Sequence, residues 1–316
     1  MTVAHGSRSF PAPRPLDLRL SLAPLRHGNG DPTIRIGRRA VIRAARTPEG
    51  PATLHLRLEE ATISAEAWGP GGEWALETAP ELLGALDDPA ALVPVDPVVA
   101  GLKRRLAGLR MPRSSGVWEA LLPSILEQKV TGREARSSFR RLVRAFGEPA
   151  PGPFGERRSG ERRSAAPFGV TLVPAPERIS GIPAYAFHRF GVEARRAEVI
   201  RSVARVGTRL NASARGEPEA TRRRMRSIPG IGPWTEAEVA RVAFGDADAV
   251  SVGDFHIPSA VSWALAGEPR GDDSRMLELL EPYRGQRGRV SLMIEIGGPP
   301  VPRYGPRMPV RSIEAL

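Results

Sequence analysis

The sequence contains no cysteine among its 316 residues. This absence excludes disulfides, thiolate zinc sites, cysteine-ligated iron–sulfur clusters and any cysteine that accepts a methyl group. Long apolar runs are also missing. No stretch approaches the ~18 residues that a membrane helix requires, and the first residues, MTVAHGSRSFPAPRP, have no apolar signal-peptide core. We therefore expect a cytoplasmic protein that has no membrane partner.

Acidic residues are too few to balance the basic ones. The 46 Lys and Arg residues against 35 Asp and Glu residues give a net charge of +11 and a pI near 11.1. Such an excess suits an anionic partner, either nucleic acid or acidic lipid, although a genome-wide preference for arginine would also produce it. The length and the 41% hydrophobic content predict two or three compact units rather than a disordered chain.

The first part of the chain has the alternating pattern of β-strands. After a flexible N-terminus over residues 1–15, we expect an antiparallel sheet domain over residues 16–92. Turn sequences such as GNGDP and TPEGP separate the runs LDLRLSL, TIRIGRRAVIRAA, ATLHLRLEE and TISAEAWG, which are the predicted strands. The run APELLGALDDPAAL predicts a covering helix. No residue in this domain indicates catalysis.

From residue 93 to residue 298 the hydrophobic period becomes that of helices. The predicted helices span residues 97–110, 115–128, 131–146, 184–206, 216–228, 233–244, 256–266, 273–281 and 286–297. Residues 148–170 include a tandem GERRS repeat and too little apolar material to pack, which predicts a flexible insertion. Residues 299–316 are expected to form a C-terminal tail.

The segment RRRMRSIPGIGPWTEAEVARVAF carries the strongest functional signal. Pro229 ends one helix and Pro233 opens the next, while Gly230 and Gly232 permit torsions or close approaches that a side chain would obstruct. This pattern predicts a helix-hairpin-helix whose backbone N–H groups bind a phosphate whatever base it carries. The alternative is an ordinary helix connection, but the flanking arginines favour binding. The predicted DNA contacts here are Gly230, Ile231, Gly232 and Thr235, made directly or through a bound monovalent cation.

A single carboxylate, Asp254, follows the hairpin at a fixed distance. A helix of about a dozen residues is roughly 18 Å long, so the turn after it can return Asp254 to the strand that the hairpin holds. There a carboxylate can stabilise positive charge on a deoxyribose and orient a water molecule. The alternative, in which Asp254 caps the helix that begins near His256, fits the spacing equally well. His256 itself either contacts phosphate or caps the helix locally.

The stretch IPGIGPWTEAEVARVAFGDADAVSVGDFHIPSA resembles the corresponding segment of the HhH-GPD superfamily of DNA glycosylases, and most closely the AlkA-type 3-methyladenine DNA glycosylase II family. LLPSILEQKVTGREARSSFRRLVRAFG resembles that family's ILGQQIS helix pair. The resemblance implies an α+β fold, with a TATA-binding-protein-like antiparallel sheet before an all-helical region. It implies that Asp254 is catalytic and that the partner is double-stranded DNA with a damaged base. Because a single site on an asymmetric lesion needs no twofold partner, we expect a monomer, and we expect it to be associated with the nucleoid. No cofactor is implied.

The resemblance also implies a reaction and a base pocket. Bifunctional relatives have a lysine directly after the GxGx of the hairpin, whereas this chain has Trp234, which predicts base release by water without strand cleavage. Alkylated purines of the 3-methyladenine and 7-methylguanine type are the expected substrates in base excision repair. The predicted pocket residues are Trp234, Trp118, Tyr283 and Glu238. The helical spacing of Trp118 with leucines makes a core position the stronger alternative for that residue, and Trp234 could combine packing with pocket lining.

Departures from the family pattern keep rival functions open. Where the family places a residue that fills the gap left by the extruded base, this chain has Lys129 between Gln128 and Val130; with Arg133 these are further predicted DNA contacts. Glu238 stands where some relatives have a pocket aromatic. The alternatives are a non-catalytic helix-hairpin-helix DNA-binding protein and a glycosylase for deaminated or oxidised bases.

Overall fold

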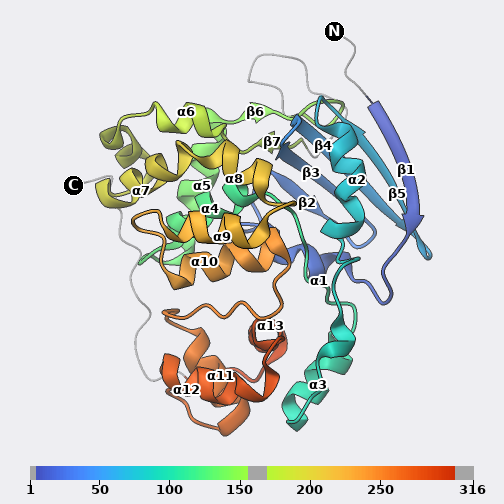
Figure 1. Ribbon diagram of the computed structural model, residues 1–316, viewed down its shortest axis with the longest axis vertical. Helices are drawn as coiled ribbons and strands as arrows, with labels where there is room; N and C mark the ends of the chain where they lie inside the picture. Colours follow the sequence, from blue (N-terminus) through green and yellow to red (C-terminus); the bar gives the residue numbers. More distant parts are fainter. Residues whose placement is uncertain (1–4, 156–168, 303–316) are drawn as a thin grey trace.

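The computed structural model describes residues 5–155 and 169–302. It is an α+β protein in which a five-stranded antiparallel sheet lies beside a much larger helical region (Figure 1). The strands are β1 His5–Pro11, β2 Ile34–Ile36, β3 Ala40–Thr47, β4 Gly50–Glu59 and β5 Thr62–Trp68, in the order β1-β5-β4-β3-β2. Val41 pairs with Leu56 and Leu56 with Ala65, and these side chains form the buried face of the sheet. The expected likeness to the TATA-binding-protein sheet stays a prediction.

The start of the sheet domain differs from the sequence-based expectation. Residues 5–11 are the edge strand β1, paired with β5, so the predicted flexible N-terminus is wrong there. The predicted strand LDLRLSL is instead helix α1, Leu18–Leu22. Asp17 accepts hydrogen bonds from the Arg19 and Leu20 N–H groups, and the cap selects a helix that buries Leu18 and Leu22 together.

Helix α2, Gly72–Leu82, covers the sheet and packs on β1, β4 and β5 (Figure 1). A covering helix was expected at residues 79–92. The observed helix begins earlier and ends at Leu82, so only the first residues of that interval are helical. Only the short 3-10 turn Pro89–Ala91 follows in that interval, with Asp88 as its cap.

The helices of the larger region fall where the period of the sequence places them. They are α3 Pro97–Arg105, α4 Val117–Glu127, α5 Gly132–Phe146, α7 Ala194–Ala204, α9 Pro218–Arg226, α10 Pro233–Val239, α11 Ile257–Ala266, α12 Asp273–Leu280 and α13 Arg287–Gly297. Gly191, in the left-handed conformation, divides the expected helix 184–206 into the 3-10 helix Ala184–Phe190 and α7. Helices α6 Pro176–Ser180 and α8 Gly207–Ser213 were not predicted.

Two separate cores divide this helical region. One surrounds α4, α5 and α7, while α3, α11, α12 and α13 form the lobe at the bottom of Figure 1 around the other. The loop that carries Asp254 connects the helices around the first core to the helices around the second. None of the helices in the described part of the chain has the length and apolar composition of a membrane span.

The helical region also contains two short strands, which lie at the two ends of the predicted insertion. β6 Glu148–Pro149 pairs with β7 Thr171–Leu172, and Ala150 and Val170 are buried against Ala44 of the sheet domain. The prediction of a flexible segment is therefore wrong at these ends. Most of the GERRS repeat lies outside the described residues, as does the tail from residue 303.

Candidate active site

Asp254 lies half-buried on the loop before α11, and both of its carboxylate oxygens are engaged. Oδ1 accepts hydrogen bonds from the His256 and Ile257 N–H groups at 2.7 and 2.9 Å. Oδ2 accepts one from the Trp234 indole nitrogen at 2.9 Å. Asp254 therefore binds the backbone at the start of α11, as its capping alternative predicted, and also faces the start of α10. Its catalytic role stays a prediction.

The loop that holds Asp254 is fixed from several sides. The Gly253 N–H donates to both carboxylate oxygens of Asp273 at 3.0 Å, and the Ser251 hydroxyl donates to Glu238 at 2.5 Å. These contacts are made by Asp273 of α12 and by Glu238 of α10. The position of the Asp254 carboxylate is consequently set before any ligand arrives.

The predicted helix-hairpin-helix joins α9 to α10, and its two glycines differ. Gly230 has φ +93°, and a Cβ added there would lie 2.4 Å from Cγ2 of Val199, so this position needs glycine. Gly232 has φ −95° and no atom within 4 Å of an added Cβ. It faces open space, where a phosphate can approach the backbone. The Ile231 side chain is buried, which leaves only its backbone for a contact.

The turn 128–130 is attached to this hairpin. The Gln128 amide nitrogen donates to the Gly230 carbonyl at 3.0 Å and to the Thr235 hydroxyl at 2.9 Å. Gln128 thus positions the hairpin, and the Thr235 side chain is buried beneath it. A DNA contact by either residue stays a prediction. Lys129 is exposed with φ +56° at the tip of the turn. Val130 is half-buried, and Arg133 is exposed on the first turn of α5.

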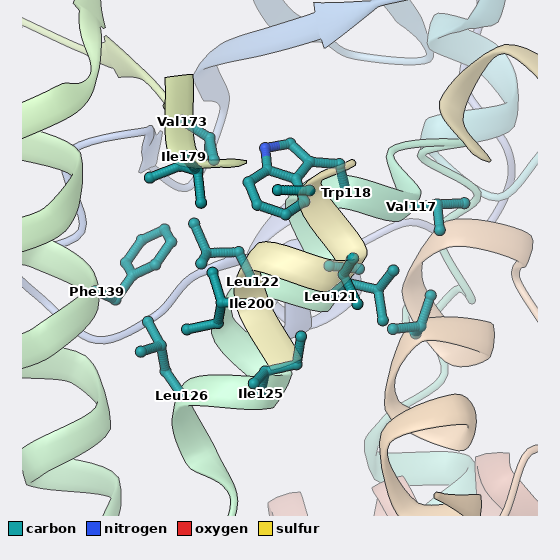
Figure 2. Close-up of a cluster of buried hydrophobic side chains, with 14 of the residues drawn as sticks. Val117, Trp118, Leu121, Leu122, Ile125, Leu126, Phe139, Val173, Ile179 and Ile200 are labelled. Carbon is teal, nitrogen blue, oxygen red and sulfur yellow. The ribbon is translucent and has the colours of Figure 1, made fainter. Parts of the chain in front are cut away.

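Two predicted pocket aromatics are instead core residues. Trp118 is fully buried among Leu121, Leu122 and Ile200, and its indole nitrogen donates to the Pro174 carbonyl at 2.9 Å (Figure 2). Tyr283 is only 4% exposed and packs in the core of α3, α11, α12 and α13. The stronger alternative for Trp118, a core position at helical spacing with the leucines of α4, is confirmed. The pocket prediction is wrong for Tyr283, because its ring packs between the helices of the second core. Trp234 and Glu238, one turn apart on α10, are both at the site.

A charged network extends the site beyond Glu238. The helix α10 continues as the π-helix Ala240–Phe244, which places Arg241 beside Glu238. Arg241 donates to Glu238 at 2.6 Å and to Glu295 of α13 at 3.3 Å. Burial lowers the pKa of Arg241, but the two carboxylates outweigh it and the net shift is upward. Arg241 therefore stays charged and links the two helical bodies.

Curated proteins and solved structures resemble this chain. No protein-family model matches the chain. Relatives in two strains of Mycobacterium tuberculosis (CDC 1551 / Oshkosh and ATCC 25618 / H37Rv), each described as a probable bifunctional transcriptional activator/DNA repair enzyme AlkA, are 27% identical over 172 residues. The match covers 53% of this chain and 32% of each relative, so the matched part spans about a third of the length of those relatives.

Solved structures match over nearly the whole chain. The 3-methyladenine DNA glycosylase of Archaeoglobus fulgidus has a TM-score of 0.68 at 20% identity, covering 91% of this chain and 96% of that chain. The 8-oxoguanine glycosylase/lyase of Clostridium acetobutylicum has a TM-score of 0.65 at 12% identity, covering 93% and 98%. The chain has the fold of these DNA glycosylases. The resemblance expected from the hairpin and the Asp254 segment is confirmed at this level.

Several residues around Asp254 were not predicted as site residues. Phe255, next to Asp254, is 84% exposed and is the largest apolar surface on the loop. Glu127 ends α4 where the resembled ILGQQIS motif has glycine, and burial raises its pKa to about 7. That departure was visible in the sequence. Arg241 and Glu295 join Glu238 only through tertiary packing, which no local pattern indicates.

An ion pair between Asp248, in the loop that carries Asp254, and Arg287 of α13 gives the protein a pH-dependent stability. The Asp248 carboxylate accepts hydrogen bonds from the Gly285 N–H and from the backbone and guanidinium of Arg287, at 2.5–3.0 Å. Burial raises the pKa of Asp248, but the Arg287 bonds outweigh it and the net shift is downward from 3.8. A lowered folded-state pKa contributes stability above about pH 4 that is lost as the pH falls further.

Asp248→Asn is therefore expected to lower the free energy of unfolding by about 1–3 kcal/mol at pH 7. At pH 3 the difference from the wild type should shrink, because pH 3 lies below the ordinary Asp pKa of 3.8, so the unfolded chain takes up a proton at Asp248 and the stabilisation falls. Urea unfolding at both pH values measures this effect. The exposed Asp272→Asn, which keeps its helix cap, serves as the control. An equal loss at pH 3 and pH 7 would show that the charge of Asp248 is not what stabilises the fold.

Proposed function

We propose that the protein is a monofunctional DNA glycosylase that releases alkylated purines, of the 3-methyladenine and 7-methylguanine type, from duplex DNA. The observation that carries this proposal is the Asp254 carboxylate held 2.9 Å from Trp234, directly behind a hairpin with an open Gly232. A backbone clamp for phosphate and an acid for the attached sugar are thus next to each other. The relatives named for alkylation and DNA repair support the same substrate class.

The geometry supports hydrolysis by water. Once the nucleotide leaves the stack, the Asp254 side chain stabilises the positive charge that develops on the deoxyribose and orients the attacking water. A cationic purine is already a good leaving group and needs little acid catalysis. Trp234 occupies the place of the lysine of bifunctional relatives and has no amine, so we expect no Schiff base and no strand cleavage. Borohydride should trap no covalent complex with DNA.

The DNA-facing surface follows from the exposed groups around Asp254. The hairpin backbone at Gly230 and Gly232 binds phosphate, either directly or through a monovalent cation. Lys129, at the tip of its turn, reaches toward the duplex, and Phe255 offers a ring to the extruded nucleotide or its neighbours. We expect a monomer, because one asymmetric lesion needs a single site.

A panel of duplexes, each with one lesion, tests the function. The panel contains 7-methylguanine, 1,N6-ethenoadenine, hypoxanthine, uracil and 8-oxoguanine, and hot alkali reveals abasic sites. We expect release of 7-methylguanine, and we expect the DNA strand to be cut only after the alkali treatment. Release of only a deaminated or oxidised base would show that the substrates are bases of that class and not alkylated purines. DNA binding without any release would favour a non-catalytic binding protein.

Phe255→Ser should weaken binding to a duplex with a tetrahydrofuran abasic analogue by about tenfold, since base–aromatic stacking contributes ~1–3 kcal/mol. The 84% exposed ring supports nothing inside the protein, so thermal stability should not change. Fluorescence anisotropy measures the affinity. Tyr185→Ser removes another ring that is 81% exposed, outside the hairpin and the Asp254 loop, and should leave binding unchanged. Equal affinities of the two variants would exclude Phe255 from the interface.

A further inference from the structure

Helix α5 carries four arginines on one face, which together form the arginine stripe: Arg133, Arg136, Arg140 and Arg144. At about 100° per residue the four fall within an arc of roughly 80°. The opposite face of the helix packs in the core through residues such as Phe139. Three of the arginines are exposed and Arg140 is half-buried. The stripe is thus a positively charged surface that the core does not use.

The arginine stripe has no counter-charge in direct contact with it. None of its four side chains forms a hydrogen bond or an ion pair with another residue of the described ranges 5–155 and 169–302. On other helices, arginines lie at hydrogen-bond distance from carboxylates, as Arg222 does from Glu236 and Arg287 from Asp248. The stripe therefore leaves four guanidinium groups available to an anionic ligand.

Glu134 and Glu127 lie near the stripe and do not neutralise it. Glu134 accepts hydrogen bonds from the N–H group and the hydroxyl of Thr131, with which it forms the cap of α5. Glu127, at the end of α4, interacts with Arg136 through space without an ion pair, and burial raises the pKa of Glu127 to about 7. Two acids against four arginines leave a net positive charge.

Two arginines of the stripe rest on the loop that precedes β2. A Cβ added at Gly28 would lie 2.5 Å from Cδ of Arg136, and one added at Gly30 would lie 2.9 Å from Nη1 of Arg140. The two glycines thus leave the space that these side chains fill. A side chain that is packed along its stem loses less rotamer freedom when its head group binds a ligand. Arg136 and Arg140 are therefore placed before an anion arrives.

The arginine stripe begins close to the hairpin. Gln128, whose amide nitrogen donates to the Gly230 carbonyl at 3.0 Å, lies in the short turn before α5 starts at Gly132. From there α5 packs along α4 and β7 (Figure 1). Arg144 lies about 16 Å beyond Arg133 at ~1.5 Å per residue. Because each DNA strand has one phosphate per ~3.4 Å of helix axis, this length matches about five base pairs.

We propose that the arginine stripe binds backbone phosphates of the duplex to one side of the damaged nucleotide. The inference rests on the proposed function and extends its DNA-binding surface from the hairpin along α5. Guanidinium groups bind phosphate oxygens through paired hydrogen bonds and read no base. The stripe therefore adds affinity whatever the sequence beside the lesion, at a distance of several base pairs from Asp254.

The salt dependence of DNA binding tests the stripe. In Arg136→Gln/Arg140→Gln the slope of log Kd against log salt concentration should become shallower by about 1.8, because each phosphate contact contributes ~0.9. Arg19→Gln/Arg104→Gln removes two exposed arginines of α1 and α3 that have no side-chain partner in the described part of the chain, and should leave the slope unchanged. Fluorescence anisotropy with the abasic-analogue duplex measures the slopes. A wild-type slope in the α5 variant, or an equal change in the two double variants, would overturn the inference.

A second α5 variant separates loss of contacts from a change in fold. Arg133→Gln/Arg144→Gln alters the two exposed ends of the stripe and leaves Arg136 and Arg140 in place. It should reduce the slope by the same amount, with an unchanged thermal unfolding temperature. If the wild type binds the duplex and neither α5 variant changes the slope, the stripe is wrong and the glycosylase proposal stands. If the wild type binds the duplex but releases no base, the proposed function is wrong and the stripe stands.

Shortening the duplex locates the contact. The flank on each side of the abasic analogue is cut in turn from about eight to about two base pairs, which removes the phosphates that the stripe can span. On one flank the wild type should lose about tenfold more affinity than Arg136→Gln/Arg140→Gln, because only the wild type has the contact to lose. On the other flank the two proteins should lose the same. Equal losses of the two proteins on both flanks would show that the stripe holds no phosphate.

Discussion

Replacing Asp254 by asparagine is expected to lower base release by about 100- to 10,000-fold, the range of a positioned acid–base group. Asparagine has the same shape, and its oxygen can still accept the hydrogen bonds from His256 and Ile257. What it lacks is the negative charge that stabilises the sugar cation. Its amide nitrogen would also face the Trp234 N–H donor, so the side chain cannot keep the wild-type geometry completely.

DNA binding separates loss of chemistry from loss of structure. Asp254→Asn should bind a duplex with a tetrahydrofuran abasic analogue at least as tightly as the wild type, because a negative charge near the phosphates is removed. Thermal unfolding verifies that the variant is folded, and Asp272→Asn, an exposed helix cap on α12, is the control for the substitution itself. Base release by Asp254→Asn at the wild-type rate would refute the catalytic assignment.

Much of the helical region could be predicted because its signals are local. The proline and glycine positions around the hairpin and the apolar period of α4, α5 and α11 each follow from neighbouring residues. The sheet domain was harder. β1 has only Phe10 buried, so its sequence carries almost no strand pattern, and it forms because β5 offers an edge. In α1 the alternation of leucines suits a strand and a helix alike, and the Asp17 cap decides between them.

In the candidate site, too, some residues could be predicted from local sequence and others depend on tertiary packing. Asp254 and Trp234 could be predicted from motif spacing, and the structure places them in contact. Trp118 and Tyr283 were assigned to a pocket because aromatic rings suit flipped bases, yet burial of large rings stabilises the cores and both lie inside. The network of Arg241 with Glu238 and Glu295 joins residues 54 positions apart in sequence, a pairing that depends on how α13 packs.

Gly230→Ala is expected to disable the phosphate clamp. The methyl group would lie 2.4 Å from Cγ2 of Val199 on α7, and the φ of +93° disfavours any residue with a Cβ. Relief requires the hairpin to move away from α7, which also strains the hydrogen bond from Gln128 to the Gly230 carbonyl. We expect a loss of about 1–3 kcal/mol in stability. Affinity for the abasic-analogue duplex should fall by about tenfold or more, as phosphate loses a set of aligned N–H donors.

Gly232→Ala distinguishes a structural glycine from one that leaves room for DNA. No protein atom lies within 4 Å of the added Cβ, and φ is −95°, so stability should be unchanged. Its methyl group projects toward the approaching backbone, so DNA affinity should still fall. Combining Gly230→Ala with Val199→Ala removes the clash but not the torsional strain, and should restore part of the lost stability. If Gly230→Ala binds DNA as the wild type does, the hairpin is not the clamp, and Asp254 would have no phosphate anchor beside it.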